Sequence, residues 1–396
     1  MNPADTENRH AIRSYPLRLK TWSFGYKPVS ETKNLKNTLK SRLSTHVFLY
    51  GSLRALNAFA NRIPRIVFRE LRFLVKSYRL VKTFDLLVVC GGGQLTEWGG
   101  PWQFPYTVCK WVMLAKIATV RCMFLNVGAG PLTHPLSKLF SRRALRAASY
   151  VSFRDHESRA LARQIGFDGS SQVFPDSAHA LHLDGSSLNC NRHGSHKVVG
   201  ISPMPYCDPR VYPGEKDQAA YEDFITKFAH LSSWLVDHSY SLCFFGSDIG
   251  VDPLAIADLQ TVLRNQLAAR ASRYNPIDSL HELLVVISAT DYVVTCRFHG
   301  VIFAHLLNKP VLAVSHHPKV ESLMKDLGLG NYCVDIRTCD PTLLAEKFSF
   351  LVSNADGIKR QMASRLGLYR SQLMSQFNQL FPQQAPAVIE APLVQQ

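Results

Sequence analysis

Short apolar runs alternate with longer amphipathic stretches along most of the chain after residue 84. Each run is rich in β-branched or aromatic residues and ends in Gly or a polar turn, as buried parallel strands do. The first four runs are DLLVVCGGG at 85–93, RCMFLNVGAG at 121–130, YVSFRD at 150–155 and SQVFPD at 171–176. The stretches between them predict helices over 106–118, 136–148 and 156–165. This alternation predicts βαβ units on a parallel sheet.

A polar segment, LDGSSLNCNRHGSHK at 183–197, interrupts the pattern and is the best linker candidate. Beyond it the alternation resumes, with strands expected at 197–203, 240–247, 291–297, 310–315 and 332–336, and helices at 219–237, 253–270, 299–307 and 319–327. The fold class is therefore α/β, with two Rossmann-like domains. We expect these domains to face a cleft at the carboxyl ends of their sheets, where such folds bind ligands.

The expected organisation has six parts along the 396 residues. A basic N-terminal segment at 1–84 belongs partly to the first domain, whose α/β core is at 85–185. A linker at 186–197 leads to a C-terminal α/β domain at 198–340, which holds the main binding site. C-terminal helices follow at 341–380, and we expect the tail at 381–396 to be disordered.

Composition narrows the class of protein. At 46% hydrophobic and 19% charged residues the chain can fill two cores and is not intrinsically disordered. The most apolar window, 107–127, is interrupted by three cations, so we expect no membrane-spanning helix. The N-terminus lacks the apolar segment of a secretory signal, and nine cysteines in apolar surroundings do not form a disulfide scaffold. We expect a cytoplasmic location.

Positive charge is concentrated at the N-terminus. The net charge is +15, and residues 1–84 hold 17 basic against 4 acidic residues. Six of these cations recur at spacings of three and four, which places them on one face of a helix: Arg62, Arg65, Arg69, Arg72, Lys76 and Arg79.

Two interpretations of this basic face stay open. Residues 62–79 could lie on an anionic membrane surface, which would make the protein peripheral at the inner face of the cell membrane. Alternatively, the helix covers a sheet and its cations are simply solvated. We expect no nucleic-acid partner, because zinc-finger spacing and aromatic–basic RNA motifs are absent from the sequence.

Two motifs in the first half could bind an anion. Gly91, Gly92 and Gly93 follow a predicted strand and could present backbone N–H groups to an anion, or they could form only a tight turn. They match neither GxGxxG nor GxxxxGK[ST].

Arg154 ends another predicted strand and could bind a carboxylate or phosphate, whereas we interpret Asp155 as the N-cap of the next helix.

The pentad CRFHG at 296–300 carries the most chemistry. We expect Arg297 and His299 to leave a strand on the same side, beside a helix N-terminus, with Lys319 opening the following helix. A cation and a titratable imidazole suit an anionic substrate that gains or loses a proton. His316 and His317 are adjacent and should point apart, and HExxH and CxxC motifs are missing, so we expect no metal.

Five segments in order resemble one family. They are DLLVVCGGG, NVGAGPL, SFRDHESRALARQIGF, VFPDSA, and SATDYVVTCRFHGVIFAHLLNKPVLAVSHHPKVESLMKDLGL, and they span about residues 85–330. Together they resemble the polysaccharide pyruvyl transferase family. The resemblance implies a two-domain transferase of glycosyltransferase-B type that moves the pyruvyl group of phosphoenolpyruvate onto a sugar.

The resemblance also implies roles for individual residues. Arg154, Arg297 and Lys319 would bind phosphoenolpyruvate, the co-substrate, and His299 would be the catalytic acid; no cofactor is implied. The acceptor would be two hydroxyls of a cell-surface polysaccharide precursor, as in exopolysaccharide biosynthesis, and a lipid-linked precursor at the cytoplasmic face fits this setting. The products would be a pyruvate ketal and phosphate.

The sequence departs from the family pattern at the N-terminus. After PLRLKTWSF at 16–24, where the first strand is expected, the loop reads GYKPVSETKN instead of Gly-Asn-x-Gly-Asp. Two other interpretations stay open, and the missing loop motivates the second of them. One is a nucleotide-sugar-dependent glycosyltransferase of the same fold, in which Arg297 and Lys319 would bind a diphosphate. The other is a non-catalytic, membrane-associated family member.

Overall fold

The computed structural model describes residues 7, 12–18, 67–183, 196–212, 215–264, 272–274 and 276–382. The chain forms two compact units, residues 1–173 and residues 174–396. Both are α/β units with parallel sheets, which confirms the fold class.

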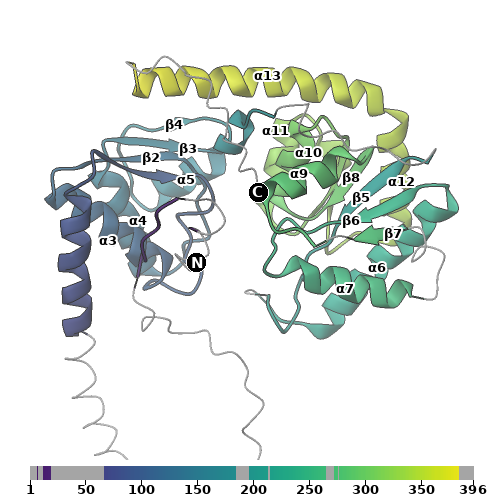
Figure 1. The fold of residues 1–396 in the computed structure, drawn as a ribbon, viewed down its shortest axis with the longest axis horizontal. Helices are drawn as coiled ribbons and strands as arrows, with labels where there is room; N and C mark the ends of the chain where they lie inside the picture. The colour runs from purple at the N-terminus through teal and green to yellow at the C-terminus, as the bar shows by residue number, and fades with distance from the viewer. Residues whose placement is uncertain are drawn as a thin grey trace, which may run out of the picture. The chain divides into compact units, whose positions relative to one another are not determined.

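The first unit is built on a four-stranded parallel sheet in the order β1-β2-β3-β4. Figure 1 labels β2, β3 and β4, which lie side by side. Its strands are β1 (Leu86–Cys90), β2 (Arg121–Val127), β3 (Tyr150–Phe153) and β4 (Gln172–Val173), and its helices are α3 (Phe104–Ile117), α4 (Pro135–Ala147) and α5 (His156–Gln164). The helix at 67–81, dark blue in Figure 1, precedes β1 and packs Phe73, Leu74 and Val81 into the same core. Because consecutive strands are neighbours, the loops that follow β1, β2 and β3 meet at one edge of the sheet.

The second unit contains a six-stranded parallel sheet in the order β10-β9-β8-β5-β6-β7. The strands are β5 (Val198–Ser202), β6 (Ser241–Phe244), β7 (Ser272–Tyr274), β8 (Tyr292–Thr295), β9 (Val311–Ser315) and β10 (Cys333–Asp335). The chain starts at β5, continues through β6 to β7, and then returns to β8 on the other side of β5. The strand order therefore reverses between β5 and β8.

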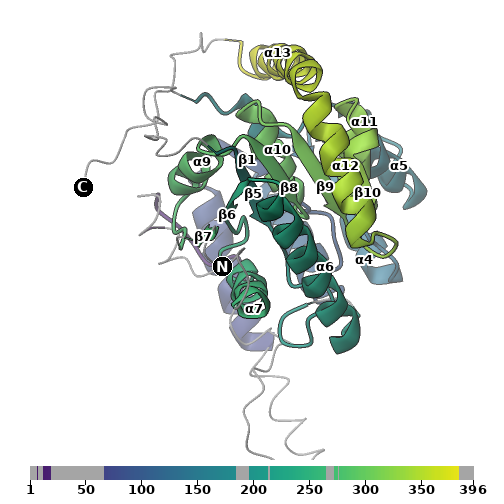
Figure 2. The same cartoon turned by 90° about the vertical axis from the view of Figure 1, so that its right-hand side faces the viewer.

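Helices cover both faces of this sheet. They are α6 (Gln218–Asp237), α7 (Asp252–Leu263), α9 (Leu280–Ser288), α10 (Phe298–Leu306), α11 (Pro318–Asp326), α12 (Pro341–Ser353) and α13 (Ala355–Leu380), with short 3-10 turns η2 (Ser177–Ala180) and η3 (Gly330–Tyr332). Figure 2 shows α6 and α12 in front of the strands, and they contact each other. On the opposite face α10 packs against α9 and α11. The strands are covered on both faces, so β8 and β9 are entirely buried along their length.

Most of the predicted elements are present, but one strand and one α-helix were not predicted, and neither were the 3-10 turns η2 and η3. The short edge strand β7 and the helix α9 fall in a stretch to which the apolar pattern assigned nothing. The predicted linker at 186–197 lies outside the described residues up to 195, as do the tail beyond 382 and most of the strand expected at 16–24.

The second unit begins earlier in the chain than the predicted linker. Residues 174–183 already belong to it, because η2 packs against α10 and α13. The ring of His179 lies 5.2 Å from that of His305 and 5.0 Å from that of Tyr369. In addition, Nη2 of Arg370 donates to the carbonyl of Leu181 at 3.1 Å. Within the described ranges no helix has the length and apolar character needed to cross a membrane.

Candidate active site

The reversal of strand order between β5 and β8 defines the best place for a ligand in the second unit. In open parallel sheets, ligands bind outside the carboxyl ends of the strands at such a reversal, since the helices on either side diverge there. The loops that follow β5, β6, β8 and β9 meet at this edge. Arg297 and His299 lie after β8, and Lys319 lies after β9.

Arg297 is held in a tight turn between β8 and α10. Its N–H donates to the hydroxyl of Thr295 at 3.2 Å, and it is the last residue before α10 begins at Phe298. A Cβ at Gly300 would collide with the Thr295 side chain, so only glycine allows the helix to approach the strand this closely. The expectation that Arg297 and His299 leave a strand on the same side is therefore wrong, because β8 ends at Thr295 and the chain is helical from Phe298 onward.

A buried carboxylate, which the sequence did not indicate, orients Arg297. The Nε of Arg297 lies 3.0 Å from Oδ1 of Asp252, and Nη2 contacts the same oxygen. The other oxygen, Oδ2, accepts the N–H groups of Ser247 at 3.1 Å and Asp248 at 2.8 Å. Asp252 is fully buried, and the Arg297 side chain is 22% exposed. A Cβ at Gly246 would lie only 2.9 Å from Cβ of Asp252, so the loop after β6 is also fitted to this carboxylate.

The electrostatics of this pair favour a charged guanidinium. Burial raises the pKa of Asp252, and the nearby charge of Arg297 opposes that shift. For Arg297, burial works against the charge, but the carboxylates of Asp252 and Asp248 together outweigh it and raise the pKa. Arg297 is therefore a fixed cation. Its charge is partly compensated by Asp252, and Oδ2 of Asp248 lies 3.8 Å from Nη2.

His299 is exposed, as a proton donor to a substrate must be. Its ring lies edge-on to Phe298 at 5.6 Å and is stacked with Phe303 at 6.2 Å. It is also within electrostatic reach of His179 on η2. Arg297 thus bonds to Asp252 of α7, whereas the ring contacts of His299 are within its own helix, α10.

Residues after β9 complete this edge. Lys319 is the second residue of α11, as expected, and its N–H donates to Nδ1 of His317 at 3.2 Å. His316, which the sequence analysis considered only as a metal ligand and rejected, is close enough to Arg297 to feel its charge. Burial, followed by the positive charges of Arg297 and His317, lowers the pKa of His316 to about 4, so this imidazole is neutral at pH 7.

The predicted anion loop in the first unit is packed against its neighbours. The N–H of Gly91 donates to the carbonyl of Leu125 at 3.0 Å, so its predicted role as an anion donor is wrong. The carbonyl of Gly92 accepts from Gly128 at 2.7 Å, and both Gly91 and Gly92 adopt a left-handed φ of 57°. The roles of Gly92 and Gly93 in binding an anion stay predictions.

Arg154 lies over the same glycine turns. Its side chain is only 5% exposed, and Nε is 3.5 Å from Oδ2 of Asp155. A Cβ at Gly128 would come within 2.7 Å of that Nε, so the guanidinium is tightly packed rather than open. Arg154 belongs to the other unit from Arg297 and Lys319, so their meeting around one anion stays a prediction. The N-cap assignment of Asp155 is confirmed, because its carboxylate accepts the N–H of Ser158 at 2.6 Å.

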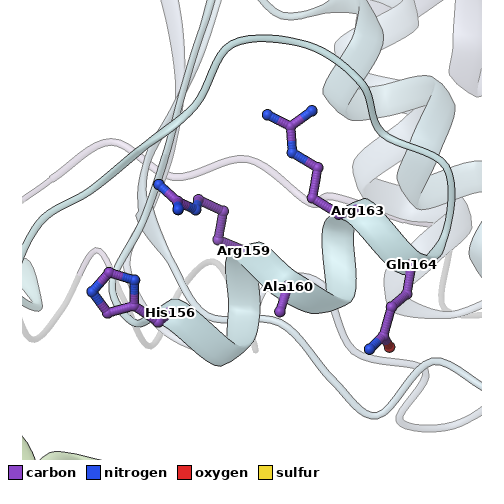
Figure 3. Close-up of a pocket in the computed structure, with 5 residues that line it drawn as sticks. All are labelled: His156, Arg159, Ala160, Arg163 and Gln164. Carbon is purple, nitrogen blue, oxygen red and sulfur yellow. The ribbon is translucent and has the colours of Figure 1, made fainter.

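A hollow on the first unit lies along α5 and contains none of the predicted site residues. It is lined by His156, Arg159, Ala160, Arg163 and Gln164, and Figure 3 shows the two arginines projecting from the same side of the helix. All five side chains come from one helix, so this surface is an open flank. Over the described residues, no group of three His, Cys, Asp or Glu side chains could hold a metal ion.

Comparisons with known proteins agree with the family that the sequence resembles. A family model described as polysaccharide pyruvyl transferase matches residues 9–318. A curated relative, the amylovoran biosynthesis protein AmsJ of Erwinia amylovora, is 19% identical over 294 residues, which are 72% of this chain and 69% of AmsJ.

Solved structures agree on the fold. A protein described as a UDP-N-acetylglucosamine 2-epimerase from Listeria monocytogenes is 11% identical with a TM-score of 0.53, and covers 79% of this chain and 80% of its own. A UDP-GlcNAc 2-epimerase from Methanocaldococcus jannaschii is 10% identical with a TM-score of 0.50, at 70% and 74% coverage. Such likeness shows the glycosyltransferase-B-type fold alone.

With most of its length matched by the family model, the chain belongs to the polysaccharide pyruvyl transferase family of transferases.

Proposed function

We propose that this transferase moves the pyruvyl group of phosphoenolpyruvate onto two hydroxyls of a cell-surface polysaccharide precursor. The products are a cyclic pyruvate ketal and inorganic phosphate. The observation that carries the proposal is the placement of Arg297, His299 and Lys319 at the strand reversal in a chain whose residues 9–318 match this family.

The reaction needs one proton at carbon and two C–O bonds. Protonation of the methylene carbon of phosphoenolpyruvate makes the adjacent carbon cationic, and a sugar hydroxyl adds there and loses its proton. The C–O bond to phosphate then breaks, phosphate leaves, and the second hydroxyl closes the ring as it loses its own proton. The two hydroxyls release two protons. One returns to the general acid that protonated the carbon, and the other is taken up by the departing phosphate, so the reaction balances.

The residues at the reversal match these needs. Asp252 engages Nε and Nη2 of Arg297, and Oδ2 of Asp248 lies 3.8 Å from the same Nη2. We assign the remaining nitrogen of this planar, pre-oriented guanidinium, Nη1, to a carboxylate or phosphate of the donor. Lys319, half-buried at the start of α11, adds a second cation and the positive end of a helix dipole. The exposed imidazole of His299 supplies the proton.

The proposal also covers the setting of the reaction. We place it at the cytoplasmic face of the membrane, with phosphoenolpyruvate as co-substrate, no cofactor, and an acceptor that is still attached to its lipid carrier. The cationic side chains exposed on the helix at 67–81 support this setting.

Thermal stabilisation of the full chain by candidate donors tests the donor. A ligand that binds only the folded state raises Tm with concentration. We expect phosphoenolpyruvate to raise Tm and Arg297→Ala to weaken that shift, whereas Arg360→Ala, on the exposed side of α13, leaves it unchanged. A shift with UDP-sugars and none with phosphoenolpyruvate would instead identify a nucleotide-sugar glycosyltransferase.

Phosphate release tests the transfer itself. Incubation with phosphoenolpyruvate and oligosaccharides that carry suitably spaced hydroxyl pairs should release phosphate only when both are present. The product should gain the mass of a pyruvyl ketal. If no donor binds and no phosphate is released with any acceptor, the chain is a non-catalytic family member and the proposal fails.

A further inference from the structure

The helix at 67–81 has a buried side that explains its attachment to the first unit. Phe73, Leu74 and Val81 pack into the core. Glu70, 7% exposed, accepts hydrogen bonds from the hydroxyl of Tyr106 and from Nζ of Lys110, each at 3.1 Å. These contacts are enough to attach the helix to the first unit. If covering the sheet were its only role, we would expect the rest of its surface to be polar.

A second, exposed sector of the same helix is apolar. Phe68, Leu71 and Val75 recur at spacings of three and four, which aligns them along one line of the helix. Their exposed fractions are 67%, 55% and 52%. Single exposed apolar residues are common on protein surfaces, but an aligned set marks an interaction surface.

The sector beside the apolar one is cationic. Arg69, Arg72, Lys76 and Arg79 are all exposed, at spacings of three, four and three. The one acidic residue between 67 and 81 is Glu70, which is buried and bonded to Lys110, so this helix presents only positive charge to its surroundings. Such a surface complements a partner that is apolar inside and negatively charged at its surface.

An exposed tryptophan packs on the tyrosine that bonds Glu70 of this helix. The ring of Trp102, 45% exposed, packs on Tyr106 at 5.5 Å, and Tyr106 in turn donates to Glu70. Tryptophan is enriched where membrane meets water, because its ring is apolar and its N–H is polar. Because Glu70 is on the buried side of the helix, these contacts place Trp102 beside that side, and it is not part of the apolar sector.

We propose that the helix at 67–81 docks the first unit on an anionic lipid bilayer. Phe68, Leu71 and Val75 enter the boundary between headgroups and acyl chains, while Arg69, Arg72, Lys76 and Arg79 contact lipid phosphates. This adds an inserted apolar sector to the electrostatic attraction that the sequence alone suggested. The docking surface is distinct from the residues proposed for pyruvyl transfer. It specifies how the membrane setting of the proposed function would be reached, and vesicle binding can be measured whether or not the chain transfers pyruvyl groups.

Sedimentation of the full chain with vesicles tests the docking. The probes are phosphatidylcholine vesicles with and without phosphatidylglycerol, at low and high NaCl. We expect binding to the anionic vesicles, weakened by salt because the surface potential is screened. The double variant Phe68→Ser/Leu71→Ser should lower the partition coefficient at least tenfold. Arg72→Gln/Lys76→Gln should lower it by roughly fivefold for each cation at low salt.

A matched control comes from α13, where Leu368 is 47% exposed and Arg360 is exposed. Leu368→Ser/Arg360→Gln should bind vesicles like the unaltered chain. Unchanged Tm in every variant shows that folding is retained, as expected for exposed positions. Equal binding to neutral and anionic vesicles, binding to neither, or full binding by Phe68→Ser/Leu71→Ser would each overturn the proposal. So would a change of oligomeric state in that variant, which would make the sector a contact between copies.

Discussion

The guanidinium of Arg297 is clamped by the buried carboxylate of Asp252, 45 residues away in the sequence, with Nε 3.0 Å from Oδ1. The same carboxylate accepts the backbone N–H groups of Ser247 and Asp248, so it joins the loop after β6 to the turn after β8. These strands flank β5, the strand at which the sheet order reverses. Asp252 is therefore a positioning residue for the cation proposed to bind phosphoenolpyruvate.

Asp252→Asn should weaken both stability and donor binding. The amide cannot balance the charge of Arg297, and it offers one acceptor oxygen in place of two. Loss of a charge-assisted buried contact costs roughly 1–3 kcal/mol. We expect a lower urea midpoint with an unchanged slope, together with weaker binding of phosphoenolpyruvate.

The double variant Asp252→Asn/Arg297→Met provides the control for that coupling. If the pair is coupled, the two losses in unfolding free energy will not add. If the losses in unfolding free energy of the two single variants simply added, Asp252 would stabilise the fold only through its hydrogen bonds to the backbone and not through Arg297.

His299→Asn should slow turnover while donor binding is kept. Loss of a general acid typically lowers rate by about 10² to 10⁴. The matched control is His230→Asn, since His230 is exposed on α6 away from the strand ends. Near-normal phosphate release by His299→Asn would remove the imidazole from the reaction.

The alternation of apolar runs predicted most of the fold because strands covered on both faces are apolar throughout. β8 and β9 are of this kind. The helix α9 was missed because its run LLVVIS has no amphipathic period. A usable signal was present, since Ser279 accepts the N–H of Glu282 at 3.2 Å and Glu282 accepts the N–H of Asp278 at 2.7 Å. That arrangement closely resembles a capping box.

The site was only partly predictable for a different reason. Arg297, His299 and Lys319 could be placed at strand ends because each is close in sequence to an apolar run. The clamp by Asp252 depends on a contact between distant segments, which periodicity does not report. The direction of His299 depended on whether the chain was still extended at that point, and residue types there did not decide between strand and helix.

Gly246→Ala should disturb the clamp through its geometry. The new Cβ would lie 2.9 Å from Cβ of Asp252, in a buried loop, so the carboxylate must shift. Overpacking of this kind costs about 1–3 kcal/mol. Gly367→Ala on α13 is the control, because nothing lies within 4 Å of its added Cβ, and it should stabilise the helix by about 0.5–1 kcal/mol. Equal effects of the two substitutions in urea unfolding would argue against the close fit at Gly246.

Two buried imidazoles should make the second unit sensitive to acid. His179 and His305 are fully buried, and their rings lie 5.2 Å apart. Burial, as the main cause, lowers the pKa of each to about 4, from an ordinary value of 6.5. Above pH 6.5 both folded and unfolded chains hold these rings neutral, and their contribution to stability is fully present. Between 6.5 and about 4 only the unfolded chain takes up the protons, so the free energy of unfolding falls as the pH drops.

The slope approaches about 1.4 kcal/mol per pH unit for each ring. Carboxylates add their own acid dependence, so the measurement is the difference between chains in urea unfolding at pH 7, 5.5 and 4.5. His179→Asn/His305→Asn should be less stable at pH 7, because hydrogen bonds to the carbonyls of Asp176 and Met362 and good packing are lost. It should nevertheless lose less further stability on acidification than the unaltered chain, whereas the exposed control His230→Asn keeps the full slope. Parallel losses in all three chains would mean that these imidazoles do not set the acid response.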